Sequence, residues 1–141
     1  MVILGVGCLG TDQQHPKAGV ASVKCSESLI SGQNMTINET QNNATICAKL
    51  NSSLIIELTD WERTGWEWSV TSSPGLQITD EGTTWYENGT PTTISGLGRG
   101  IHEWNVTMND TGVQTIKAIL RFPGTDRRRD ESTFNLTIVV E

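Results

Sequence analysis

The chain has 141 residues, enough for a single domain that buries its own hydrophobic core. Its formal net charge is −6 at pH 7, which disfavours binding to nucleic acids or anionic membranes as its main activity, because both need a basic surface. Thr, Ser, Asn and Gly are abundant, and there are only four Pro. Together with many β-branched residues, this composition favours an all-β domain. No apolar run is long enough for a membrane-spanning helix.

Residues 1–24 show no periodic pattern and are predicted to be a leader and linker before a folded domain at residues 25–141. Cys8 follows a short apolar segment, as the modified Cys of a bacterial or archaeal lipoprotein signal does. Because that segment is too short for a complete signal, two interpretations are open: lipidation of Cys8, or an unstructured start containing a Cys by chance. If Cys8 is the lipid anchor, Cys25 and Cys47 remain as an even pair that can form a disulfide.

Several segments alternate between apolar and polar residues with a period of two, which predicts half-buried strands. In the first two thirds of the chain, strands are predicted at residues 35–37, 45–50, 54–58, 66–70, 76–78 and 84–86. In the last third the pattern is clearest, with strands predicted at residues 102–108, 116–120 and 134–140, a turn at 109–112 and a polar loop at 125–131. This series of short strands, without a helical period, predicts an antiparallel β-sandwich.

The acceptor pattern for N-linked glycosylation, Asn-X-Ser/Thr, recurs along the chain. It occurs at Asn34, Asn38, Asn43, Asn51, Asn88, Asn105, Asn109 and Asn135. The last four are the candidate sites. Asn105 and Asn135 alternate with apolar residues and are therefore expected to face solvent, while Asn88 and Asn109 fall in turn-like segments. Their placement supports an extracellular or cell-surface protein.

The sequence lacks the residue patterns of the common catalytic and metal sites. His15 and His102 are far apart, and no Cys-X-X-Cys or His-X-His spacing suggests a zinc site. No Ser lies in a nucleophile elbow, and the glycine cluster at residues 96–100 lacks the Lys-Ser/Thr of a phosphate-binding loop. We therefore expect no enzyme activity, no metal and no cofactor, and we interpret His102 as a structural residue.

Three motifs beside predicted strands are rich in glycine, aromatic residues and arginine. They are residues 64–68 (Thr-Gly-Trp-Glu-Trp), 96–100 (Gly-Leu-Gly-Arg-Gly) and 121–124 (Arg-Phe-Pro-Gly). Glycine lets the backbone approach a partner closely, and aromatic and arginine side chains dominate interface energetics. Because binding residues concentrate in loops, the motifs favour binding over catalysis. Each motif can also be explained singly as an ordinary turn of a sandwich, with Trp68 in the core.

In their order and context, the three motifs resemble the chagasin family of inhibitors of papain-like cysteine proteases. The family's first motif reads Asn-Pro-Thr-Thr-Gly-aromatic-X-Trp; residues 61–68 keep Thr64, Gly65 and both aromatic residues, but begin with Trp-Glu-Arg. The second family motif is glycine-rich and precedes a strand with aromatic residues, as residues 96–106 do. The third, Arg-Pro-Trp, corresponds to residues 121–123, which read Arg-Phe-Pro. The resemblance covers roughly residues 35 to 141.

The resemblance implies an immunoglobulin-like antiparallel β-sandwich that wedges three loops at one end into the cleft of a papain-like cysteine protease. Thr64 and Gly65 would then approach the catalytic Cys and His of the protease. The implied protease-binding residues are Thr64, Gly65, Trp66, Gly96, Leu97, Gly98, Arg99, Gly100, Arg121 and Phe122. Inhibition would be reversible, without a cofactor, and the inhibitor is expected to be a monomer.

A different class of function is also open, because the same sandwich is common in cell-surface modules that bind or adhere without inhibiting anything. Inhibition of papain distinguishes the two. On either reading, the expected location is extracellular or at the cell surface, with membrane attachment only through a lipid on Cys8.

Overall fold

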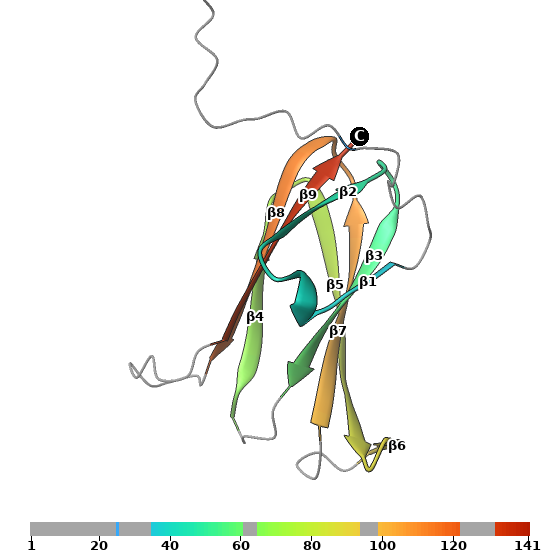
Figure 1. The fold of residues 1–141 in the computed structure, drawn as a ribbon, viewed down its shortest axis with the longest axis vertical. Helices are drawn as coiled ribbons and strands as arrows, with labels where there is room; N and C mark the ends of the chain where they lie inside the picture. The colour runs from blue at the N-terminus through green and yellow to red at the C-terminus, as the bar shows by residue number, and fades with distance from the viewer. Residues whose placement is uncertain (1–24, 26–34, 61–64, 94–98, 122–131) are drawn as a thin grey trace, which may run out of the picture.

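Two β-sheets pack face to face around a shared core (Figure 1). The structure is a computed structural model and describes residue 25 and residues 35–60, 65–93, 99–121 and 132–141. Its elements are β1 (Met35–Ile37), the one-turn 3-10 helix η1 (Glu39–Gln41), β2 (Ala44–Ala48), β3 (Ser53–Asp60), β4 (Glu67–Ser72), β5 (Leu76–Glu87), β6 (Thr90–Thr92), β7 (Arg99–Met108), β8 (Gly112–Arg121) and β9 (Ser132–Val140). The predicted all-β sandwich is thus confirmed.

One sheet has the strand order β1-β3-β7-β5-β6, and the other has the order β2-β9-β8-β4. Most neighbouring strands are antiparallel, as predicted, but β1 pairs with β3 and β2 pairs with β9 in parallel. The parallel pairs arise because η1 lies between β1 and β2, and the chain crosses there from one sheet to the other. Each of the two strands joins the edge of a different sheet instead of forming a hairpin. The sandwich is therefore mixed rather than purely antiparallel.

Side chains that recur with a period of two form the core, since alternate residues of a strand share one face. All four apolar residues on the inner face of β9 are at most 2% exposed; they are Phe134, Leu136, Ile138 and Val140. The matching inner residues of β3, β7 and β8 are Leu54, Ile56, Leu58, Trp104, Val106, Met108, Ile116, Ala118 and Leu120. Burying each large apolar side chain contributes about 1.5–3 kcal/mol, so these four strands supply most of the packing energy.

Strand β5 is longer than its sequence pattern predicts. Residues 76–78 and 84–86 were expected to form two short strands, but they belong to one continuous strand, Leu76–Glu87. The polar residues between them pair with β7, with a shift in register between Asp80 and Gly82. Gly82 takes a positive φ of 88° there, a conformation that glycine adopts without strain. The bulge breaks the period of two, which is why the alternation in the sequence stops while the strand continues.

Other strand boundaries also differ from the prediction. β3 extends two residues further than predicted, through Thr59 and Asp60, because both are paired with the start of β7. β2 ends at Ala48 instead of Leu50, and Leu50 is 39% exposed in the turn that follows. The short strand β6 was not predicted, since Thr-Pro-Thr has no apolar alternation.

A disulfide joins Cys25 to Cys47, the pair named in the sequence analysis, with a Cα–Cα distance of 5.8 Å. The two cysteines are 22 residues apart in sequence, so the bond closes a loop that contains β1 and η1. Closing a loop stabilises the folded state mainly by restricting the unfolded chain. The crossing segment between the two sheets is therefore tied at its start to β2.

Replacing both cysteines with serine (C25S/C47S) should lower the free energy of unfolding by about 3 kcal/mol, the loop-closure value for this length. Urea titration of oxidised wild type and of the double variant measures the difference, and reduced wild type is the control that should unfold like the variant. Equal stability of all three proteins would contradict a stabilising disulfide.

Candidate functional site

The strand ends that border all three predicted binding motifs lie at one end of the sandwich, drawn at the bottom of Figure 1. At this end, Asp60 closes β3 and pairs with Gly100 at the start of β7. Glu67 opens β4 and pairs with Arg121, the last residue of β8. Ser132 opens β9 beside the end of β8. We call this the motif end; it brings together segments as far apart in sequence as Asp60 and Arg121, which are 61 residues apart.

The predicted binding residues are only partly in loops. Gly65 and Trp66 directly precede β4, but Arg99 and Gly100 are the first residues of β7, and Arg121 is the last residue of β8. The prediction placed these last three in loops; instead, pairing with β5 and β4 extends both strands to include them. The remaining predicted residues lie outside the described residues: Thr64, Gly96, Leu97, Gly98 and Phe122.

Gly65 is exposed and has a positive φ of 93°. A side chain in this conformation is strained, so the backbone before β4 favours glycine for its own geometry as well as for close approach to a partner. The neighbouring Trp66 is half-buried. Arg121 is exposed at the end of β8, the strand that pairs with β4. This part of the motif end offers a partner bare backbone next to a large aromatic ring and a guanidinium group.

Thr59 lies one residue before the end of β3, next to the motif end, and forms hydrogen bonds with three other elements. Its backbone N–H donates to a side-chain oxygen of Glu39 in η1, and its carbonyl accepts from Trp68 Nε1 in β4 at 3.2 Å. Its hydroxyl accepts from Arg99 Nη2 in β7 at 3.0 Å. Thr59 is only 8% exposed. These contacts, which we call the Thr59 hub, fasten the strand ends beside the first and second motifs to one another.

The Glu39 carboxylate suits its place in the hub. Partial burial raises its pKa, but the hydrogen bonds from Thr59 and the nearby positive charge of Arg99 lower the pKa by more, so that the net shift is downward. Glu39 is therefore ionised at neutral pH and accepts a charge-assisted hydrogen bond, which is stronger than a neutral one. An open pocket of about 300 Å³ lies beside it, lined by Glu39, Asn42, Thr59, Trp68, Arg99, Ser132, Thr133 and Phe134.

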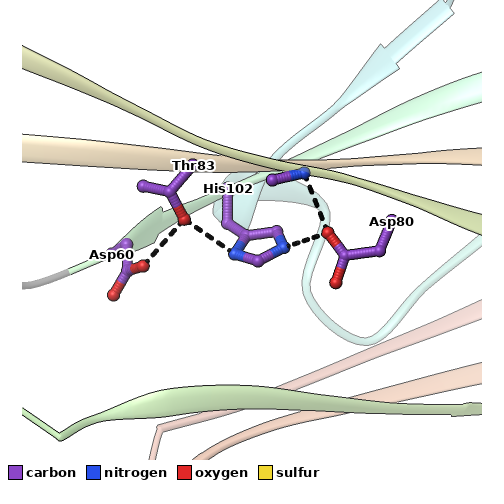
Figure 2. Close-up of polar contacts among 5 residues, drawn as sticks. Asp60, Asp80, Thr83 and His102 are labelled. Atoms are coloured by element: carbon purple, nitrogen blue, oxygen red, sulfur yellow. Dashed lines mark hydrogen bonds and ion pairs between the residues drawn. The ribbon is translucent and has the colours of Figure 1, made fainter. Parts of the chain in front are cut away.

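A second polar network lies on β3, β5 and β7 (Figure 2). His102 Nε2 is 2.6 Å from Asp80 Oδ1, and His102 Nδ1 is 2.8 Å from Thr83 Oγ1. The Thr83 hydroxyl donates to Asp60 Oδ2 at 3.0 Å. His102 also stacks on Trp104, with ring centroids 4.1 Å apart. The network thus links the inner edge of the core to Asp60, the residue that precedes the first motif.

The order carboxylate, imidazole, hydroxyl is that of hydrolase triads, but the hydrogen-bond directions exclude this role. The Thr83 hydroxyl gives its proton to the Asp60 carboxylate, so it has no proton to give to His102 Nδ1, and the imidazole does not act as a base toward it. Asp80 then accepts from Nε2–H. Partial burial raises the pKa of Asp80, but hydrogen bonds from His102 and from the Gly82 N–H lower it by more. The network is a structural support, the role expected for His102.

Gly100 has a packing role that its position in a glycine-rich motif does not predict. A Cβ atom at this position would lie 2.8 Å from the Thr83 methyl group and 2.8 Å from the Trp85 ring. The Trp85 indole therefore packs directly over the Gly100 backbone, where β5 and β7 pair. Gly100 is buried, and its lack of a side chain allows this close packing within the sandwich.

The Thr59 hub and the network around His102 were missed because their partners are distant in sequence. A local signal was present for η1: Asn38 followed three residues later by Gln41 is a helix-capping pattern. In the structure the Asn38 side chain accepts from Thr40 N, and Gln41 Oε1 accepts from Asn38 N, both at 2.9 Å. This pattern predicts a helical turn but does not predict that Glu39 reaches β3.

Neither a metal site nor a membrane span is found in the parts of the chain that the structure describes. There, no three His, Cys, Asp or Glu side chains gather closely enough to hold a metal ion. None of the helical structure in those parts is long and apolar enough to cross a membrane.

The four candidate glycosylation sites differ in their surroundings. Asn88 is exposed in the turn before β6, with a φ of 49°, and Asn109 is exposed after β7, with Nδ2 3.4 Å from Gln77 Oε1. Asn105 is half-buried on β7. Asn135 is half-buried on β9, and its Nδ2 donates to Asn43 Oδ1 at 3.3 Å. Asn88 and Asn109 are thus the most accessible of the four. Cys8 lies outside the described residues.

Comparison with protein families gives one match over more than half of the chain. Residues 47–138 match the family described as chagasin family peptidase inhibitor I42. No curated protein sequence matches the chain.

Several solved structures have a similar fold. The solution structure of amebosin has a TM-score of 0.62 and 28% sequence identity, covering 78% of this chain and 100% of amebosin. The cysteine protease inhibitor EhICP2 from Entamoeba histolytica has a TM-score of 0.65 and 18% identity, covering 77% of this chain and 96% of EhICP2. PbICP-C, solved in complex with falcipain-2, has a TM-score of 0.53 and 14% identity, covering 78% and 100%. At these last two identities the likeness establishes the fold alone.

Replacing Gly100 with alanine should lower the free energy of unfolding by about 1–3 kcal/mol, because the new methyl group overlaps the Trp85 ring and the Thr83 methyl group. Urea titration measures the loss. The double variant G100A/T83S keeps the hydroxyl of residue 83 but removes its methyl group, and it should recover part of the loss relative to T83S alone. A G100A protein as stable as wild type would show that the close packing over residue 100 is absent.

Proposed function

The chain belongs to the chagasin family of peptidase inhibitors, and from this premise we propose that it binds the active-site cleft of papain-like cysteine proteases through the motif end. Membership of the family makes it an inhibitor of peptidases rather than an enzyme. The observation that carries the assignment of the binding surface is the convergence of the strand ends beside all three motifs at one end of the sandwich (Figure 1).

The physical basis of inhibition is occlusion by a surface that is rigid before binding. Binding costs free energy for every group that becomes ordered, so a surface already held in place binds more tightly. At the motif end, the Thr59 hub joins β3, β4 and β7, and the network around His102 supports Asp60. Both lie directly behind the residues that border the motifs. No covalent step with the protease is required.

Two described residues are assigned to contact the protease. Gly65 presents bare backbone, so a protease surface can approach it without a side chain intervening. Arg121 is an exposed residue at the end of β8 and pairs with Glu67, two residues after Gly65, and arginine is among the residues that most often dominate interface energies. Glu67, the partner of Arg121 in strand pairing, is also exposed at this edge.

Arg121→Ala should raise the inhibition constant for papain by about tenfold, as expected for loss of one interface arginine contact. Lys117→Ala is the matched control: Lys117 is also an exposed cation of β8, four residues earlier, but it lies away from the motif end. It should leave inhibition unchanged. Gly65→Trp should weaken inhibition further, because a bulky side chain both blocks close approach and strains the positive φ. Replacing Arg127, Arg128 and Arg129 should matter less.

The measurement is residual activity of papain and of a cathepsin-L-like protease across an inhibitor titration, with circular dichroism to show that each variant is folded. If the folded wild type inhibits neither enzyme at high micromolar concentration, the proposed target class is wrong, and a non-inhibitory cell-surface module becomes the better interpretation. Equal effects of R121A and K117A would move the binding surface away from the motif end.

We further propose that the protein acts as a monomer outside the cell or at its surface. The Cys25–Cys47 disulfide supports this location, since such bonds persist in oxidising compartments. Glycans on Asn88 and Asn109 fit the exposure of both side chains, and a lipid on Cys8 would provide membrane attachment. Mass spectrometry of protein from its native source tests both modifications. Unmodified Asn88, Asn109 and Cys8 would count against the glycoprotein and lipoprotein assignments, and light scattering tests the monomer.

A further inference from the structure

We propose that Glu39 is a positioning residue for the protease-binding end: it holds the end of β3 in the geometry that the first and second motifs need. The inference rests on the proposed function and assigns a role in it to a segment outside the family match. Glu39 precedes residue 47, where that match begins. It lies on η1, in the segment that crosses from one sheet to the other.

Glu39 sits on a backbone that is fixed on both sides. Before it, the side chain of Ile37 is fully buried in the core. The capping contacts of Asn38 and Gln41 then fix the single turn of η1, and after it Asn43 N donates to the carbonyl of Asn135 in β9 at 2.8 Å. The Cys25–Cys47 disulfide closes the loop containing this turn. A residue held in this way has already lost its backbone freedom, so only the rotamer entropy of its side chain opposes the contact.

The Glu39 carboxylate supplies a hydrogen-bond acceptor at the edge of β3, beyond the point where pairing with β1 stops. β1 pairs with β3 only as far as Ile37 and Ile56, so among the described residues no strand lies beside the last residues of β3 on that side. A buried backbone N–H without a partner destabilises the fold. Glu39 supplies the acceptor for Thr59 N, one residue before Asp60 ends β3. The crossing segment thus completes the hydrogen bonding of β3 where the first motif begins.

The contact at Thr59 N is transmitted to the two neighbouring motifs by the other bonds of the same residue. Thr59 O accepts from the indole of Trp68, the last residue of the first motif, and Thr59 Oγ1 accepts from the guanidinium of Arg99 in the second motif. The negative charge of Glu39 and the positive charge of Arg99 also attract each other, and this attraction contributes to the lowered pKa of Glu39. Loss of the carboxylate should therefore loosen Trp68 and Arg99 together.

The test compares Glu39→Ala, Glu39→Gln and a control, Val140→Ala. Val140 is buried in β9 at the end opposite the motifs, where it pairs with Ala48 and Gly112, so V140A lowers stability without touching the motif end. Two quantities are measured well below the melting temperature: the inhibition constant for papain, and hydrogen exchange by NMR of the Trp68 indole and of the amides of residues 65–67 and 99–101.

E39A should raise the inhibition constant about tenfold. It should also raise the hydrogen-exchange rates at these positions by a similar factor, because each effect corresponds to the loss of one charge-assisted hydrogen bond. E39Q keeps an acceptor for Thr59 N and should recover most of both effects. V140A should change neither, whatever its melting temperature. If E39A and V140A behave alike, Glu39 contributes only to stability and the inference is overturned.

The exchange measurement separates this inference from the proposed function. If wild type does not inhibit papain but E39A still loosens the motif end, the protease assignment fails while the positioning role of Glu39 stands. If wild type inhibits and E39A neither weakens inhibition nor speeds exchange, the proposed function stands and the role of Glu39 is rejected.

Discussion

The hydrogen bonds made by Thr59 fix the end of the sandwich on which binding depends. A sandwich is held together by apolar packing, and packing alone does not orient the last residues of its strands, because the core ends before they do. In this chain the buried apolar residue Leu58 is followed by two buried polar residues, Thr59 and Asp60. Each has defined partners on neighbouring strands. Directional bonds thus replace packing at the point where the chain leaves the core.

Polar groups placed there are stable only if they are satisfied, because an unpaired buried donor or acceptor costs about 1–3 kcal/mol. Within the described residues, no buried side-chain nitrogen or oxygen lacks a hydrogen-bond partner. The network around His102 shows how this is achieved, since each hydroxyl, imidazole and carboxylate in it meets a complementary group. Satisfied networks of this kind favour one arrangement over its alternatives. The motif end therefore combines polar chemistry with a fixed shape.

The sequence predicted the parts of the fold that follow a local period and not the parts that depend on distant contacts. β7, β8 and β9 were predicted because their apolar residues alternate without interruption. β5 was predicted only in pieces, because its bulge at Gly82 disrupts the alternation. The Thr59 hub joins residues 9, 20 and 40 positions away from Thr59, and no periodic or motif-based rule connects such positions. The glycine at position 100 was recognised, but its reason, the Trp85 ring above it, required the structure.

The difference between local patterns and distant contacts helps to explain how the first and third motifs can depart from those of the chagasin family while the family fold is kept. Two of the three hub contacts use the backbone N–H and carbonyl of Thr59, which any residue other than proline provides. The partners of Thr59 in the hub, Glu39, Trp68 and Arg99, all lie outside residues 61–63 and 122–123, so these contacts do not use the side chains at which the motifs depart from the family. Rigid strand ends reduce the entropic cost of binding for whatever motif they carry, whereas discrimination between targets depends on individual attractive and repulsive side-chain contacts. Residues 61–63 and 122–123 can then change target preference without loss of the scaffold's contribution to affinity.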